Sequence, residues 1–335
     1  MVSLRPALGR LGSLLPTALN VLQLVGWTAF EIIVMGEAAA KISGPFLGSM
    51  TKLFWMALFT AWCTLLAVGG PLAVVRQWLE KFGIWMVYAS TIWITYQLAT
   101  AGIPTLSSPG PGMPLPLALD LVVAMPVSWM PLVSDYNRFA RRPRSGFLGT
   151  FAGYTLANTW FYALGAGLAL STGSEDVVTP ILTLLYGNLA LILILVDETD
   201  NAFADIYSAS VSIQNAFRAS HWKLAVTVAA VSFTVAAVTP ITQYENFLLM
   251  IGGVFVPLFG VLIADSLGRN YDLNDFYEKA PSLNPRGLVA WLIGAATYFA
   301  IAYGYPDLGA TIPSLAISFA THMLLARRLS GNGLA

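Results

Sequence analysis

The stretch LLPTALNVLQLVGWTAFEIIVMGEA, residues 14–38, decides the class of this protein. About 20 predominantly apolar residues are enough for a helix to cross the hydrocarbon core of a bilayer. Similar stretches recur along the whole chain, separated by short segments rich in proline, glycine and charge. The sequence therefore predicts ten membrane-spanning helices, at residues 14–38, 53–71, 82–102, 117–137, 146–171, 179–217, 222–240, 245–266, 287–305 and 309–326.

The composition supports an all-α, polytopic membrane protein. Of the 335 residues, 57% are hydrophobic and only 10% are charged, whereas soluble domains carry about 25% charged residues. Membrane lipid is thus an expected partner, and we treat residues 1–335 as one transmembrane domain. The formal net charge is zero, so no nucleic acid partner is expected. Nothing in the sequence calls for an obligate protein partner.

The distribution of basic residues predicts the orientation, because cytoplasmic loops carry an excess of lysine and arginine. With the N-terminus in the cytoplasm, only Lys41 and Lys52 fall on the outer side, and every other basic residue falls inside. Two spans within 179–217, joined by an acidic loop, would divide the basic residues almost evenly. We therefore predict one crossing there, overlong or broken, and a plasma-membrane protein with both termini in the cytoplasm.

The first predicted span carries a polar stripe. Asn20, Gln23, Trp27 and Glu31 lie three or four residues apart, so they share one face of a helix. Two amides, an indole and a carboxylate suit a flat ligand that forms hydrogen bonds. Charged groups at this depth are expensive and normally have a function. The alternative is that these side chains join neighbouring helices.

The fourth predicted span contains two prolines, Pro126 and Pro131, around Ser128 and Trp129. Proline removes a backbone donor and clashes with the preceding turn, and broken helices build the midplane binding sites of many secondary transporters. We expect the chain to be non-helical or sharply bent between about Pro126 and Pro131, with Pro126, Ser128 and Trp129 beside the substrate. A simple proline kink is the alternative.

The sixth predicted span contains a cluster of acidic residues, Asp197, Glu198, Asp200 and Asp205, beside Thr199 and Asn201. Ionised carboxylates repel one another in a low dielectric, so some must be protonated, ion-paired or bound to a cation. Such coupled carboxylates form proton relays. We predict that Asp197, Glu198 and Asp200 couple transport to a cation, that Glu198 is the foremost proton carrier, and that Asp205 matters less. A solvated acidic loop is the alternative.

Other polar residues carry weaker signals. Asp135 is expected to pair with Arg138 or Arg141, and His221 and His322 lack the spacing of metal ligands, so neither a metal nor a cofactor is expected. An intramembrane enzyme is not indicated. An aspartyl protease needs Tyr-Asp and Gly-x-Gly-Asp motifs on adjacent spans, a metalloprotease needs His-Glu-x-x-His, and the sequence has neither arrangement.

The chain resembles the nucleobase:cation symporter family 1, and within it the hydroxymethylpyrimidine permeases, which are relatives of cytosine permease. The likeness is carried by Asn20 to Trp27 with Glu31, by Ser134-Asp135-Tyr136-Asn137-Arg138-Phe139-Ala140-Arg141, and by Asp197-Glu198-Thr199-Asp200-Asn201 followed by Ile206-Tyr207-Ser208-Ala209.

The resemblance implies a LeuT-type inverted-repeat fold whose third to twelfth helices match the ten spans, so that the family's first two spans are absent here. It implies that Trp27 and Glu31 hold the substrate ring, that the broken helix includes 125–129, and that a substrate-binding asparagine falls at or near Glu198, close to Asn201. Sodium-coupled members carry hydroxyl ligands about a turn before that asparagine. Residues 190–196 contain no hydroxyl, which favours proton over sodium coupling.

These observations predict a secondary active transporter that imports a small pyrimidine-like ring, hydroxymethylpyrimidine first, by proton symport. Sodium is the alternative coupling ion. The alternatives are a permease for cytosine, another nucleobase or a hydantoin, and a truncated remnant that does not transport.

Overall fold

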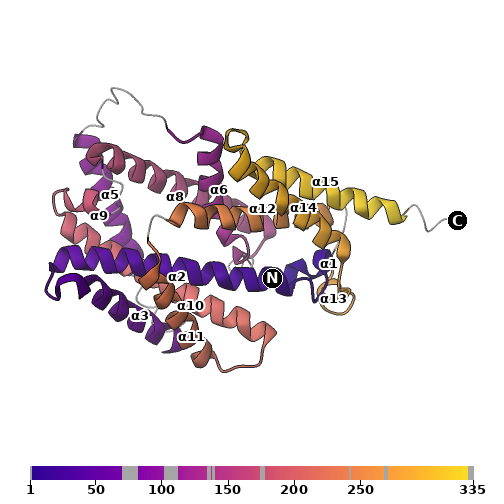
Figure 1. The fold of residues 1–335 in the computed structure, drawn as a ribbon, viewed down its shortest axis with the longest axis horizontal. Coiled ribbons are helices and arrows are strands. Elements are labelled where there is room, and N and C mark those ends of the chain that lie inside the picture. Colours follow the sequence, from indigo (N-terminus) through magenta and orange to yellow (C-terminus); the bar gives the residue numbers. More distant parts are fainter. Residues whose placement is uncertain are drawn as a thin grey trace. The chain divides into compact units, whose positions relative to one another are not determined.

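The computed structural model describes residues 2–69, 82–101, 112–133, 137, 140–173, 178–240, 243–267 and 271–330. Within these ranges every regular element is a helix (Figure 1). The long helices are α2 (Leu14–Ser43), α3 (Thr51–Gly69), α5 (Ile84–Ala101), α6 (Leu115–Trp129), α8 (Pro143–Thr172), α10 (Gly187–Ala216), α11 (His221–Val238), α12 (Tyr244–Ser266), α14 (Pro285–Gly304) and α15 (Thr311–Ser330). The short ones are α1 (Arg5–Leu8), α9 (Val178–Leu182), α13 (Leu273–Tyr277) and the 3-10 turns η1 (Val2–Leu4), η2 (Gly48–Met50) and η5 (Pro306–Leu308).

Every predicted span overlaps one of these helices, because long apolar runs can satisfy their backbone in lipid only as helices. In the described parts of the chain, five segments are long and apolar enough to cross a membrane: Leu14–Ser43, Gly48–Gly69, His221–Val238, Tyr244–Ser266 and Pro285–Gly304. Two shorter apolar helices are Leu115–Trp129 and Thr311–Ala326. The predicted all-helical class is confirmed, and the number of crossings stays a prediction.

The predicted span 179–217 is interrupted once. α9 ends at Leu182, Tyr186 adopts a left-handed backbone with φ 57°, and α10 begins at Gly187. A Cβ atom at position 187 would lie 2.0 Å from the carbonyl oxygen of Ile181, so only glycine fits this close approach. The acidic residues all follow this turn, inside the continuous helix α10. The alternative that they form a loop is therefore wrong.

The contacts between helices divide the described chain into two compact units. One consists of Met1–Gln23, Gly110–Pro143 and Thr242–Ala335, and the other of Leu24–Pro109 and Arg144–Ile241. The boundary falls within α2, which is a continuous helix. The assignment of the whole chain to one transporter domain stays a prediction.

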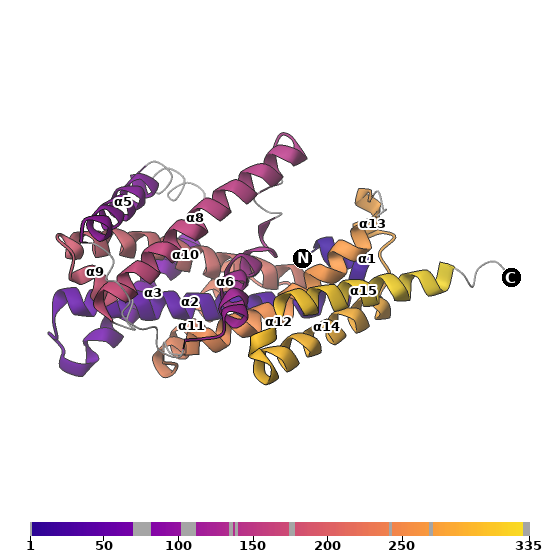
Figure 2. The same cartoon turned by 90° about the horizontal axis from the view of Figure 1, so that it is seen from above.

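In the unit that contains both termini, α12 is the central helix. It packs against α6, α14 and α15 (Figure 2). Glycines permit these close contacts: a Cβ atom at Gly252 would lie 2.2 Å from the hydroxyl oxygen of Tyr298, and one at Gly260 would lie 2.2 Å from Oγ of Ser318. In the other unit, an apolar core joins α5, α8, α9 and α10 to the end of α2, and α3 packs on α10 and α11.

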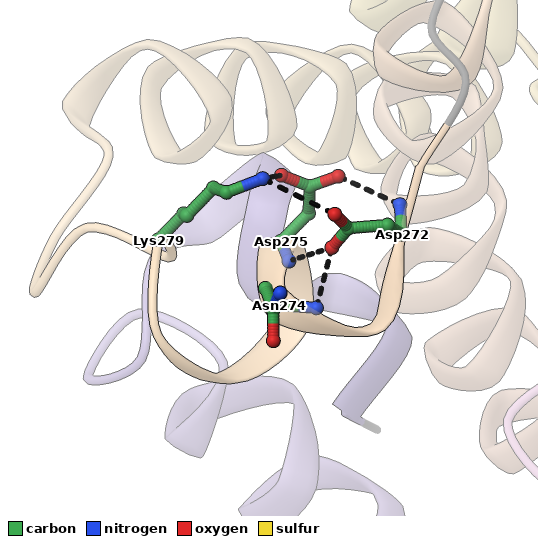
Figure 3. A network of polar contacts seen from close by, with 4 residues as sticks. All are labelled: Asp272, Asn274, Asp275 and Lys279. Atoms are coloured by element: carbon green, nitrogen blue, oxygen red, sulfur yellow. Dashed lines mark hydrogen bonds and ion pairs between the residues drawn. The ribbon is translucent and has the colours of Figure 1, made fainter.

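The loop before α14 holds a short polar network (Figure 3). Asp272 accepts hydrogen bonds from the backbone of Asn274 at 2.5 Å and of Asp275 at 3.2 Å, which caps α13. Lys279 Nζ lies 3.2 Å from Asp275 Oδ1 and 3.3 Å from Asp272 Oδ2. Hydrogen bonds to Asp275 and, to a smaller extent, to Asp272 raise the pKa of Lys279 above its usual value. This stabilisation is complete below a pH of about 10.4 and is lost only as the pH rises through the raised pKa.

A buried carboxylate joins α6 to the start of α15. Asp120 is 3% exposed, and its two oxygens accept hydrogen bonds from the backbone nitrogens of Ala310 at 2.6 Å and Thr311 at 2.9 Å. The first amides of a helix lack partners in their own helix, and a carboxylate there also interacts favourably with the helix dipole. Asp120 is thus the N-terminal cap of α15, supplied by another helix.

We predict that Asp120→Ala destabilises this unit by about 2–4 kcal/mol, because two buried amides lose charge-assisted partners. The measurement is thermal unfolding of the purified protein in detergent. Asp120→Asn keeps one acceptor and should lose less stability. An alanine variant that unfolds at the original temperature would contradict this role.

Candidate functional site

The polar residues predicted on α2 lie on its buried face. Asn20, Gln23 and Glu31 are 1%, 4% and 7% exposed, respectively. Trp27 is half-buried and meets Phe30 in a T-shaped contact with ring centroids 6.2 Å apart. The stripe therefore faces protein rather than lipid, as the spacing predicts.

Helix α6 ends close to the predicted break. The helix continues through Pro126 and Ser128 and ends at Trp129, followed by a turn over residues 130–132. Of the interruption predicted between Pro126 and Pro131, only the second half is present: residues 126–129 are helical, because a proline within a helix can be accommodated as a local loss of one donor, and the turn begins at residue 130. Pro131 is the proline that ends the helix.

The hydrogen bonds at the end of α6 show why. Pro131 has no N–H, so the carbonyl of Val127 accepts from Met130 at 3.2 Å instead. The amide of Leu132 then bonds to Trp129 O at 2.9 Å, one residue short of its helical partner. The carbonyl oxygen of Ser128 is thereby released from the helix.

Gln23 supplies the missing donor. Its Nε2 donates to Ser128 O at 2.8 Å and to Asn20 Oδ1 at 2.8 Å. Gln23 therefore joins α2 to α6, as the alternative interpretation of the stripe predicts. The Ser128 hydroxyl donates to Met125 O at 2.6 Å within its own helix, so the group of Ser128 that another helix contacts is its carbonyl. Pro126 and Trp129 are both half-buried.

The acidic residues of α10 fall into two classes of exposure. Asp205 is buried at 7% exposure, whereas Asp197, Glu198 and Asp200 are half-buried, as is Asn201. Glu198, Asn201 and Asp205 are spaced three and four residues apart and so share one face of the helix. The helix is anchored beside them by Thr199, whose hydroxyl lies 3.7 Å from Met35 Sδ of α2.

Glu31 of α2 belongs to the same group of carboxylates. Asp205, Glu198, Asp197 and Asp200 of α10 all lie within electrostatic range of Glu31. Oε2 of Glu31 is buried and has no hydrogen-bond partner in the described residues. No described lysine or arginine forms an ion pair with any member of the group. Two helices of one unit thus bring acidic side chains together without a basic partner among the described residues.

Several polar contacts in the structure were not predicted from the sequence. Asp265 of α12, 5% exposed, lies 3.2 Å from Nε2 of the buried His322 and accepts a hydrogen bond from Tyr271. His221 Nε2 lies 3.0 Å from the carbonyl oxygen of Ala67. Asp265 and Asp120 each stand as an acid within an apolar run, and this was the only sign of them in the sequence. The partner of Asp265, His322, lies 57 residues away along the chain. The predicted pairing of Asp135 with Arg138 or Arg141 lies outside the described residues.

Comparison with known proteins supports the fold and the class. A family model described as permease for cytosine/purines, uracil, thiamine, allantoin matches residues 1–322. The inward-facing conformation of Mhp1 is similar with a TM-score of 0.76 and 20% identity, covering 99% of this chain and 77% of that chain. A second similar structure is that of Mhp1, a nucleobase-cation-symport-1 family transporter, in a closed conformation with bromovinylhydantoin bound. Its TM-score is 0.73 and its sequence identity 19%, and the match covers 99% of this chain and 79% of that chain. No curated protein sequence matches. The predicted LeuT-type fold is confirmed, and the matched model describes permeases rather than enzymes.

The grouping of carboxylates predicts an effect on stability. At pH 8, Glu31→Gln should raise the midpoint of thermal unfolding by about 1–3 °C, because an amide of the same shape removes like-charge repulsion in a poorly solvated place. Glu37→Gln is the matched control on the same helix: Glu37 forms ion pairs with Lys41 and Lys52, each at 3.2 Å, and its replacement should not stabilise. A lower midpoint for Glu31→Gln would show that Glu31 is held by attractive contacts.

Proposed function

This chain belongs to the family of permeases for cytosine/purines, uracil, thiamine and allantoin, and we propose that it imports a pyrimidine-like ring, hydroxymethylpyrimidine first, by proton symport. The observation that carries the proposal is the buried, unpaired carboxylate of Glu31, one turn from Trp27 and facing the acids of α10. Polar residues inside membrane helices normally mark substrate or ion pathways.

Trp27 and Glu31 offer complementary chemistry for such a ring. An indole provides a flat face on which an aromatic ring can stack. A protonated carboxyl group has one O–H donor and one carbonyl acceptor. The amino group and the neighbouring ring nitrogen of a 4-aminopyrimidine present the opposite pair, an N–H donor and a lone-pair acceptor. The neutral form of Glu31 therefore matches this edge, and the ionised form, which only accepts, does not.

This match links binding of the substrate to protonation of Glu31. The ring is bound best when Glu31 holds a proton, and departure of the proton to a carboxylate on α10 removes one of the two hydrogen bonds. Ligand and proton then favour each other's binding, which is the reciprocity that symport requires. Glu198 remains our foremost proton carrier from the sequence, and Asp205 joins it because it is buried and interacts electrostatically with Glu31.

Cytosine shares the aminopyrimidine edge, so it is the second candidate substrate, and the hydantoin bound by Mhp1 makes that ring a third. Uptake of labelled hydroxymethylpyrimidine, cytosine and hydantoin by cells that produce the chain separates them. Absence of uptake of all three would refute the proposed function and favour a remnant that does not transport.

We predict that Trp27→Ala weakens substrate binding about 5- to 150-fold, because base–aromatic stacking contributes roughly 1–3 kcal/mol. The measurement is the substrate concentration for half-maximal binding to purified protein. Trp27→Phe keeps an aromatic face and should retain much of the affinity. Unchanged binding by a variant that combines Trp27→Ala with Glu31→Ala would remove both residues from the site.

We also predict that Glu198→Gln and Asp205→Asn each abolish accumulation driven by a pH gradient while leaving exchange of substrate across the membrane partly intact. An amide keeps the shape of a carboxyl group but cannot carry a proton through the cycle. The assay is uptake into vesicles under imposed proton or sodium gradients, with Glu37→Gln as the control. Accumulation that follows sodium and ignores the proton gradient would overturn proton coupling.

A further inference from the structure

The turn between α10 and α11 encloses a cavity of about 420 Å³ that opens to the outside of the protein. The residues that line it all come from this turn and the end of α10: Gln214, Phe217, Arg218, Ala219 and Ser220. Two hydrogen bonds shape the turn. The amide of Phe217 donates to Ile213 O at 2.9 Å, and Nε2 of Gln214 donates to Ala219 O at 2.9 Å. The volume lies within the range of about 300–1,000 Å³ that is usual for small-molecule sites.

The charge around this cavity is positive. Arg218 belongs to its lining, Lys223 follows on the first turn of α11, and both side chains are exposed. None of the five lining residues is acidic, and no described carboxylate forms an ion pair with Arg218 or Lys223. A guanidinium group presents a fork of donors that matches the oxygens of a phosphate. The cavity therefore suits an anionic group, and a phosphate in particular.

Two exposed aromatic rings accompany the basic side chains. Phe217 is 70% exposed and Trp222 is 54% exposed, and Nζ of Lys223 lies 5.6 Å from the centre of the Trp222 ring. Helix α11, which begins beside them, is long and apolar enough to cross a membrane. Tryptophan is enriched at the level of the lipid headgroups, and basic side chains near helix ends reach the same level. The turn thus combines cations and apolar rings where a membrane span begins.

We propose that this turn binds one anionic phospholipid, with the phosphate held by Arg218 and the upper part of the acyl chains against Phe217 and Trp222. A free phosphate ester would use the arginine but leave both rings unoccupied. A zwitterionic lipid adds a cationic group that Arg218 and Lys223 repel. Basic pockets at the cytoplasmic ends of membrane helices bind anionic headgroups in this way, and the distribution of basic residues predicts that this turn is cytoplasmic. The site is separate from the carboxylates proposed to carry protons.

The test uses Trp222 as its reporter, because brominated acyl chains quench the fluorescence of an indole that they touch. The purified chain in a neutral detergent is titrated with brominated phosphatidylglycerol or with phosphatidylcholine that carries the same chains. The sequence has ten tryptophans, so each protein is also measured with Trp222→Phe, and the difference is the signal of Trp222. Each basic side chain near a lipid surface adds about a factor of five in affinity, so we expect half-maximal quenching at a mole fraction of phosphatidylglycerol about 5- to 25-fold lower than that of phosphatidylcholine.

Arg218→Gln should raise the half-maximal mole fraction of phosphatidylglycerol about fivefold and leave that of phosphatidylcholine unchanged. The matched control is Arg144→Gln: Arg144 is also exposed, lies near the exposed Phe147 in the same compact unit and lines no part of the cavity, so its replacement should leave both titrations unchanged. Equal quenching by the two lipids, or the same loss in both variants, would overturn the proposal. Relief of the quenching by glycerol phosphate would also overturn it, because the site would then take the phosphate ester without the lipid.

Discussion

A backbone carbonyl that leaves its helix within a membrane must find a donor inside the protein, because lipid offers none. The irregular places of this fold obey that constraint with side chains from other helices. Ser128 O, released at the end of α6, accepts from Gln23 of α2. Leu185 O, in the turn between α9 and α10, accepts from Trp93 Nε1 of α5 at 2.8 Å. The first amides of α15 donate to Asp120 of α6. Each of these three places is therefore also a specific contact between helices.

The carboxylates of α2 and α10 present the opposite case. Asp120 and the carbonyls of Ser128 and Leu185 have hydrogen-bond partners. Glu31 and Asp205 are both buried and form no ion pair with a described lysine or arginine. A structure selected only for stability would replace such a pair by apolar or amide side chains, since an unpaired charge in a low dielectric is strongly unfavourable. Buried ionisable groups in membrane helices often belong to proton relays, which is the role proposed for this pair.

The sequence predicted the helices well and their ends less well. Apolar runs are a direct consequence of lipid contact, so each predicted span overlaps a helix. The spacing of Asn20, Gln23 and Glu31 predicted a shared face, and all three are buried. The end of α6 was placed too early, because local proline chemistry marks both Pro126 and Pro131 while only the second ends the helix. The bond between Gln23 and Ser128 spans 105 residues, and a contact between distant segments has no local signal in a single sequence. The burial of Asp205 likewise has no local signal.

Gln23 and Glu31, both on the polar stripe of α2, differ in how they respond to pH. The amide of Gln23 keeps the same donors and acceptor at every pH that a cell meets, so its hydrogen bond to the carbonyl of Ser128 does not depend on a proton. The carboxyl group of Glu31 gains a donor when it is protonated and loses it when it ionises, so its fit to an aminopyrimidine edge changes with proton binding. In the function proposed above, this change in Glu31 links binding of the ring to binding of a proton.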